Sequence, residues 1–216
     1  MTLALDHIVV AARTLADGVQ WCEATLGVTP DAGGRHALMS THNRLLAIGS
    51  PAFARAYLEI IAIDPEAPAP GRARWYDLDD PALQAALAGG PRLIHWVLGC
   101  DRILERTQAL RDAGLDTGEV LDVQRGALRW RLGVRPDGRR LGRGAVPTLI
   151  EWPGPHPSDQ LPASSVSLER LTVCGVAPAA AALCDEAGVL RSIDGPPLVA
   201  VLSTPRGRVE LRSTDS

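Results

Sequence analysis

The sequence predicts an α+β fold made of two tandem βαβββ modules, followed by a shorter third module of the same kind. Three observations support this prediction. The order of one strand, one helix and three strands recurs along the chain. Each predicted helix ends at a glycine, which is a typical stop signal. Finally, His7 and His95 take matched places in the first strand of their modules, as Glu59 and Glu151 do in the last strand. With 216 residues, the chain can bury a sizeable core without disulfide or metal staples.

The first module is predicted over residues 1–64. Residues 5–12 are rich in β-branched side chains and predict a buried strand. Residues 16–26 predict a helix, with Thr14 as its N-cap and Gly27 as its stop. Three further strands are expected at 36–40, 44–49 and 56–64.

A proline-rich connecting segment, 65–90, separates the first module from the second, and a short helix is expected within it at 82–87. The second module is predicted over 91–153. Its helix is expected at 102–113, with Asp101 as cap and Gly114 as stop. Its strands are expected at 92–99, 119–125, 128–135 and 147–152.

The last part of the chain repeats the pattern in a shorter form. Residues 153–165 are rich in Pro and Ser and predict a linker. A partial third module is expected over 165–216, and we expect it to pack against the other two and cover a sheet edge. Its elements are predicted at 166–174, 179–187, 191–193, 198–203 and 208–212.

Composition excludes several classes of function. A net charge of −3 argues against nucleic acid as a partner, and no apolar run is long enough for a membrane-spanning helix. All 22 basic residues are arginine, so neither a Schiff-base lysine nor a P-loop lysine is available. The first residues lack the features of a secretory signal, and the four cysteines form no CxxC pair. We therefore expect a cytoplasmic protein whose cysteines are buried small hydrophobes.

Four segments together resemble the vicinal oxygen chelate superfamily, and within it the glyoxalase-like domain proteins of the glyoxalase, bleomycin-resistance and dioxygenase type. The segments are Leu5-Asp6-His7-Ile8-Val9-Val10, Gly33-Gly34-Arg35-His36, Tyr57-Leu58-Glu59-Ile60-Ile61-Ala62 and Leu149-Ile150-Glu151-Trp152. The resemblance covers residues 3–152 and, more loosely, the tail. It implies that the paired modules form a curved, eight-stranded mixed sheet around an open cavity.

The resemblance also implies a metal site. In glyoxalase I, a His on the first strand and a Glu on the last strand of each module bind a divalent metal. Carried over, the ligands are His7, Glu59, His95 and Glu151, the metal is Zn, Ni, Mn, Co or Fe, and Glu59 or Glu151 doubles as the catalytic base. Strand alternation predicts that Leu5, His7 and Val9 share one face. A lone His such as His7 would fit a hydrogen-bonded core position or a strand-end surface position better than a metal site, and each Glu alone could face solvent; the metal site depends on the matched positions in both modules.

Three further residues are candidates for substrate binding. His36 follows Gly33 and Gly34, which permit a tight turn, and its side chain is expected at the cavity mouth. Arg129 and Arg131 flank Trp130 and therefore share one face. If that face lines the cavity, the two arginines predict an anionic substrate; the alternative is a pair of solvated arginines on the outside of the sheet.

Together these features predict a metal-dependent enzyme of the glyoxalase type, acting as an isomerase, epimerase or lyase on a small oxygenated molecule through a metal-bound enolate. The alternatives are a metal-free small-molecule binding or resistance protein that uses the same cavity, and a ring-cleaving dioxygenase. The expected partner is a small molecule rather than nucleic acid or a membrane, and a homodimer is possible.

Overall fold

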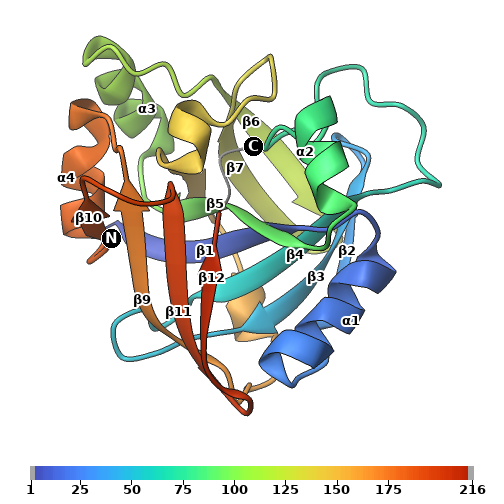
Figure 1. The fold of residues 1–216 in the computed structure, drawn as a ribbon. Helices are drawn as coiled ribbons and strands as arrows, with labels where there is room; N and C mark the ends of the chain where they lie inside the picture. Colours follow the sequence, from blue (N-terminus) through green and yellow to red (C-terminus); the bar gives the residue numbers. More distant parts are fainter. Residues whose placement is uncertain (1–2, 214–216) are drawn as a thin grey trace.

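The computed structural model describes residues 3–213; residues 1–2 and 214–216, at the ends of the first and third predicted modules, lie outside the described residues. An eight-stranded mixed sheet has the order β2-β3-β4-β1-β5-β8-β7-β6, and a separate four-stranded sheet has the order β10-β9-β11-β12 (Figure 1). The strands of the large sheet are β1 Ala4–Ala11, β2 Asp31–His36, β3 Thr41–Ala47, β4 Tyr57–Ile63, β5 Arg92–Gly99, β6 Glu119–Arg125, β7 Leu128–Val134 and β8 Thr148–Glu151. Those of the small sheet are β9 Ser167–Cys174, β10 Leu190–Ser192, β11 Leu198–Thr204 and β12 Gly207–Arg212.

The two modules meet along their first strands. Strand β1 pairs antiparallel with β5 in the middle of the large sheet, and each of them pairs in parallel with the last strand of its own module, β4 or β8. The helices are α1 Leu15–Leu26, α2 Pro81–Leu87, α3 Ile103–Asp112 and α4 Pro178–Glu186. The predicted α+β fold, with tandem modules and a third module at the C-terminus, is confirmed.

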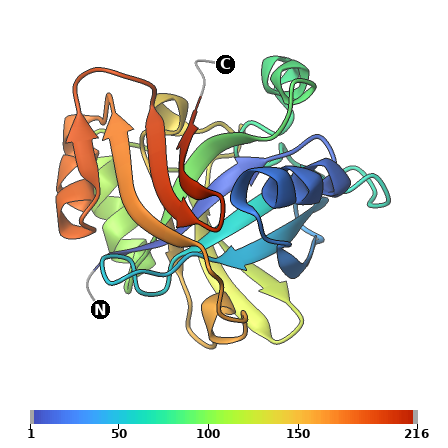
Figure 2. The same ribbon diagram turned by 60° about the horizontal axis from the view of Figure 1, so that its bottom comes forward.

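The larger hydrophobic core lies on the convex face of the curved sheet. Apolar residues of β1, β4 and β5 pack there against α1, α3, α4 and the small C-terminal sheet (Figure 2). The third module therefore packs against the other two as expected, but it covers the middle of a sheet face, where β11 and β12 lie against β5, and not the sheet edge that we expected it to cover. The reason is apolar area: the convex side of the central strands is fully hydrophobic and must be covered.

A second, smaller apolar cluster lies on the concave face. It joins Val9, Ile61 and Val97 from the central strands to Trp75 and Tyr76 from the connecting segment. Helix α2 contributes Leu83 and Leu87 to the same cluster. The concave side is thus filled partly by a segment that belongs to neither module.

Two local predictions differ from the structure. Strand β2 occupies residues 31–36, and the predicted strand at 36–40 is largely a turn in which Ser40 has φ 48°. Helix α3 takes its N-cap at Arg102, not at the predicted Asp101, and the Arg102 side chain forms no capping hydrogen bond with the helix backbone. By contrast, Thr14 caps α1 as predicted, since its side chain accepts a hydrogen bond from the Asp17 N–H.

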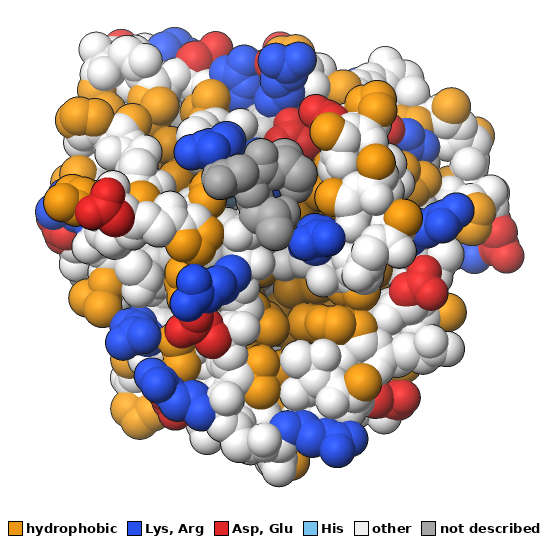
Figure 3. Space-filling model, viewed as in Figure 1, with side chains coloured by type: hydrophobic (Ala, Val, Ile, Leu, Met, Phe, Trp, Pro, Cys, Tyr) orange, Lys and Arg blue, Asp and Glu red, His pale blue; other side chains and the backbone are white. Residues whose placement is uncertain are grey.

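The surface carries both signs of charge. On the face drawn in Figure 3, Arg side chains are interspersed with Asp and Glu and with apolar side chains. Within residues 3–213, no helix is long and apolar enough to cross a membrane.

Candidate functional site

Two matched β-bulges turn the histidines of the first strands toward the concave face. Between β1 and β5, Asp6 on one strand and Ile94 on the other have no partner in the register, and each directly precedes the histidine of its module. A bulge inserts one residue and reverses the alternation of faces. Leu5 consequently packs in the convex core while His7 lines a concave pocket, so the predicted shared face of Leu5 and His7 is wrong.

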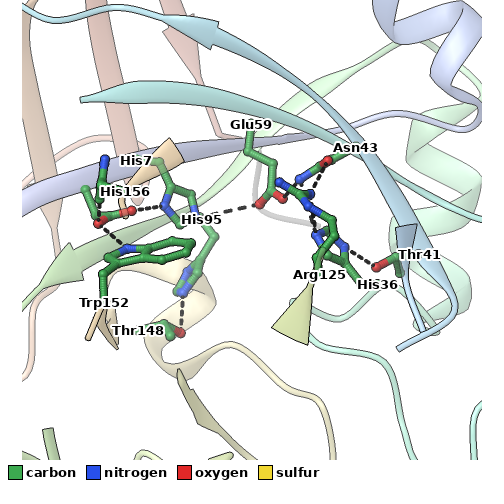
Figure 4. A network of polar contacts seen from close by, with 11 residues as sticks. His7, His36, Thr41, Asn43, Glu59, His95, Arg125, Thr148, Trp152 and His156 are labelled. Carbon is green, nitrogen blue, oxygen red and sulfur yellow. Dashed lines mark hydrogen bonds and ion pairs between the residues drawn. The ribbon is translucent and has the colours of Figure 1, made fainter. Parts of the chain in front are cut away.

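His7 and Glu59 form a buried pair in this pocket. The His7 Nε2 atom lies 3.6 Å from Oε2 of Glu59, and the two residues are 3% and 6% exposed. The imidazole also stacks on the Tyr57 ring, with centroids 4.6 Å apart. The predicted His7 and Glu59 are therefore brought together, and Figure 4 shows them side by side at the centre of a larger polar network.

Asp6 holds the other side of the His7 ring. Its Oδ1 lies 2.6 Å from His7 Nδ1, while Oδ2 accepts hydrogen bonds from Trp152 Nε1 at 2.9 Å and His156 Nε2 at 2.9 Å. The backbone N–H of Ser158 donates to Nδ1 of His156, so the proton of that ring sits on Nε2, facing Asp6. Burial alone would raise the pKa of Asp6, but the hydrogen bonds from His156 and His7 outweigh it and hold that pKa well below its usual range.

Because Asp6 stays ionised, His7 keeps a proton on Nδ1 and presents Nε2 to Glu59. The arrangement is that of an oriented acid–base pair: one carboxylate fixes the ring, and the ring faces a second carboxylate. Asp6 and His156 were missed as site residues. Asp6 directly precedes His7, but His156 lies in the linker, and no sequence signal connects it with β1.

A second branch of the network starts at Glu59 and ends at an arginine. Asn43 donates to Oε1 of Glu59 at 2.6 Å, and its Oδ1 accepts a hydrogen bond from Arg125 Nη1 at 2.9 Å. His36 lies beside them: its Nε2 is 3.3 Å from both Asn43 Nδ2 and Arg125 Nη1, and its Nδ1 is 3.0 Å from Thr41 Oγ1. Burial and, next, the Arg125 charge lower the pKa of His36 to about 3, so the ring is neutral.

The Gly33–Gly34 pair makes room for this branch. A Cβ on Gly33 would lie 2.1 Å from Asn43 Oδ1, and one on Gly34 would lie 2.5 Å from Cδ of Arg125. The Gly34 N–H also donates to Asn43 Oδ1 at 2.8 Å. These glycines permit the close approach of two side chains, rather than the tight turn that the sequence suggested.

Aromatic residues close the pocket and divide the concave space. Trp75 and Tyr76 line both the pocket of His7 and Glu59 and a second pocket that contains His95. The Tyr76 ring packs against His95 with centroids 5.0 Å apart. Tyr76 and its neighbour Asp77 have φ of 62° and 60°, a backbone conformation that residues other than glycine seldom adopt. The chain turns here while Trp75 and Tyr76 pack against the concave face of the sheet.

The other two predicted metal ligands are placed differently. His95 is buried in the second pocket, with its Nε2 2.9 Å from Thr148 Oγ1, and burial and then the Arg140 charge hold its pKa well below the usual range. Glu151 does not point into either pocket. Its Oε1 accepts a hydrogen bond from the Arg102 N–H at the start of α3, and its Oε2 lies 2.6 Å from Arg131 Nη2.

The donors therefore do not fit the metal site that the superfamily implies. Within residues 3–213, no group of three or more His, Cys, Asp or Glu side chains could hold a metal ion. The physical reasons are that Glu151 stabilises the start of α3 and that Tyr76 packs on the His95 ring. Of the four predicted ligands, only His7 and Glu59 form a direct pair.

The predicted substrate residues also separate. His36 lines the pocket of His7 and Glu59, as does Arg125, which the sequence did not single out. Arg129 and Arg131 line a separate hollow with Asp122 and Pro153. Trp130, between them, lines both this hollow and the pocket of His7 and Glu59. Arg125 lies at the end of the predicted strand 119–125, next to the turn. The sequence does not show whether its side chain faces the concave side of the sheet, so it gave only a weak signal for a site residue.

A model of the glyoxalase-like domain matches residues 5–187, and the chain belongs to this family. The predicted resemblance to the vicinal oxygen chelate superfamily is thereby confirmed. No curated protein matches the sequence.

Several solved structures share the fold. A hypothetical protein from Staphylococcus aureus is 14% identical, with a TM-score of 0.55 over 100% of this chain and 87% of that one. Methylmalonyl-CoA epimerase from Mycobacterium tuberculosis is 18% identical, with a TM-score of 0.40 over 70% of this chain and 89% of that one. A variant of Streptomyces coelicolor methylmalonyl-CoA epimerase in complex with 2-nitronate-propionyl-CoA is 19% identical, with a TM-score of 0.45 over 71% of this chain and 100% of that one. At these identities the likeness concerns the fold alone.

Proposed function

We propose that this protein is an acid–base enzyme that moves a proton on a small oxygenated molecule, in the manner of an isomerase, epimerase or lyase. The observation that carries the proposal is the buried contact between His7 and Glu59, 3.6 Å apart, with His7 fixed from behind by Asp6. A carboxylate in an aromatic pocket, with one oxygen bonded to Asn43 and the other facing an imidazole, suits general acid–base catalysis.

Glu59 is the base in this proposal. Its Oε2 accepts the proton from a carbon next to a carbonyl group, and the electron pair of the broken C–H bond moves onto the carbonyl oxygen to give an enolate. For this step His7 carries a second proton on Nε2, which donates a hydrogen bond to the enolate oxygen, while Asp6 stabilises the charge on the ring. Protonated Glu59 then returns its proton to a carbon of the enolate, which restores the base. The proposal contains no metal-dependent step, because the four predicted donors do not converge.

Deuterium uptake tests the proposal. Small 2-hydroxy and 2-oxo carbonyl compounds are incubated with the purified protein in D2O, and loss of the α-proton signal is followed by NMR. Exchange is expected with the wild type and should fall at least about 100-fold in Glu59→Gln, in line with the usual share of a general base. Glu151→Gln is the matched control, because this Glu bonds Arg102 and Arg131 outside the pocket.

The same assay after chelator treatment separates two mechanisms. Exchange that survives chelation supports the metal-free proton transfer. Exchange that is abolished by chelator and restored by added Zn, Ni, Mn, Co or Fe would contradict it and support a metal-dependent enzyme instead.

A second candidate function is small-molecule binding without chemistry. It is favoured by the aromatic walls of the pocket, which Tyr57, Trp75, Trp130 and Trp152 supply. It predicts ligand-induced thermal stabilisation with no α-proton exchange, in the wild type and in Glu59→Gln alike.

A further inference from the structure

Arg125 is a charged group without a countercharge. Its Nη1 donates to Asn43 Oδ1 at 2.9 Å and lies 3.3 Å from Nε2 of His36, and both of these partners are neutral. Among the described residues, no acidic side chain forms an ion pair with it. Its remaining guanidinium nitrogens, Nε and Nη2, form no hydrogen bond with the described residues and are not fully buried, and Arg125 lines the pocket of His7 and Glu59.

We propose that Arg125 binds a carboxylate group of the substrate. A guanidinium with two free donors on one side fits a carboxylate in a forked, two-bond geometry. This inference rests on the proposed function only in taking the bound molecule to be a substrate; the anion site itself stands on the geometry around Arg125.

The surroundings of Arg125 are built to hold it. Gly34 leaves space for its side chain, since a Cβ there would come within 2.5 Å of Cδ, and Asn43 fixes Nη1. Neutral His36 beside it adds no competing charge. Arg125 comes from β6 of the second module, whereas Asn43 and His36 come from β3 and β2 of the first, so the site exists only when the sheet curls and the two edge strands meet (Figure 4).

Asn43 links Arg125 to the base. One end of its amide group bonds Nη1 of Arg125 and the other end bonds Glu59. The free nitrogens Nε and Nη2 form another edge of the planar guanidinium, so a carboxylate on them lies on the side of Arg125 that faces away from Asn43. The free space in the pocket is about 30 Å³, which is room for only a few water molecules, so a molecule bound at Arg125 extends out of the pocket or displaces a lining side chain.

Binding of simple probes tests the site without any turnover. Glycolate and acetate are titrated into the protein by NMR, with acetamide as the uncharged analogue, against wild type, Arg125→Gln and Arg129→Gln. We expect both anions to bind wild type and Arg129→Gln with the same affinity, and Arg125→Gln with an affinity at least about tenfold lower. Both anions should bind wild type more tightly than acetamide does. Arg129 is the matched control because it lies on the neighbouring strand but in the hollow outside the pocket.

Glu59→Gln separates this inference from the proposed function. It should bind glycolate at least as tightly as wild type does, because it loses a negative charge near the anion, while losing α-proton exchange. If Glu59→Gln loses exchange but still binds glycolate, the anion site is supported. It is also supported if the wild type binds the anions but catalyses no exchange, although the proposed function then fails. Equal affinity in wild type and Arg125→Gln, equal affinity for acetamide, or no binding of either anion would overturn the inference. If Arg125→Gln does not fold, Arg125→Lys should still bind the anions, with weaker affinity because the fork is lost.

Discussion

The Oγ1 atom of Thr148 lies 2.9 Å from Nε2 of His95, at the place that a second glutamate would need in order to face that ring. The strand register shows the correspondence: Val9 pairs with Glu59 across β1 and β4, and Val97 pairs with Thr148 across β5 and β8. Each Val lies two residues after the histidine of its module. Thr148, not Glu151, is therefore the counterpart of Glu59, and the second module presents a hydroxyl where the first presents a carboxylate.

Replacement of Glu151 should affect stability and not the pocket. Glu151→Gln weakens the hydrogen bond to the start of α3 and removes the ion pair with Arg131, and we expect a loss of about 1–2 kcal/mol in the free energy of unfolding. Urea denaturation measures this loss. Glycolate binding should be unchanged, and a strong effect on binding with no effect on stability would show that Glu151 belongs to the site.

The glycine pair of β2 should respond position by position. Gly33→Ala puts a Cβ 2.4 Å from the Asn43 carbonyl oxygen, and this backbone atom cannot move away, so we expect a loss of about 1–3 kcal/mol. Gly34→Ala meets only the Arg125 side chain, which can shift, so it should reduce anion binding more than stability. Gly71→Ala is the control, since a Cβ there meets nothing within 4 Å. Equal stability losses at positions 33 and 34 would contradict the contact pattern.

Acid should destabilise the fold through its buried neutral histidines. The pKa of His36 falls from the ordinary 6.5 to about 3 on folding, because of burial and then the Arg125 charge. Below pH 6.5, His36 binds a proton in the unfolded chain but not in the folded one. The free energy of unfolding therefore falls as the pH decreases, by about 1.4 kcal/mol per pH unit for this group. His36→Gln should reduce the slope of stability against pH by that amount between pH 6 and pH 4. Urea denaturation across this range measures it, and an unchanged slope would show that His36 is not buried as a neutral ring.

Asp6 should stabilise the fold as an ionised group, whereas His36 is buried as a neutral one. Hydrogen bonds from His156 and His7 lower its pKa below the ordinary value, so its contribution is complete above about pH 4 and is lost as the pH falls further. Asp6→Asn should cost about 3 kcal/mol at pH 7, because it removes the charge that three buried donors share. Asp122→Asn, an exposed position, should stay within about 0.5 kcal/mol of wild type. A shift of the His7 ring resonances in Asp6→Asn, followed by NMR, would show that the tautomer depends on Asp6.

Much of the architecture could be predicted from local patterns. The strands at 92–99 and 119–125, the cap at Thr14 and the helix before Gly27 follow from β-branched runs, capping chemistry and glycine stops, all of which act over a few residues. The pairing of His7 with Glu59 was also predictable, because both residues interrupt apolar strands and a charged group there needs a partner.

The rest of the site depends on distances that sequence does not contain. The bulges at Asp6 and Ile94 change which residues face the pocket, and no residue type marks them. Arg125 reaches the pocket only because β6 curls round to β2, and His156 only because the linker folds back onto Asp6.

The sequence by itself determined two related modules, a third module and one His–Glu pair, since these follow from periodicity and burial along each segment. The tertiary structure alone decided that Thr148 faces His95, that Glu151 stabilises a helix, and that Arg125 meets Asn43. These relationships are set by strand register and sheet curvature, in which a shift of one residue turns a side chain to the opposite face.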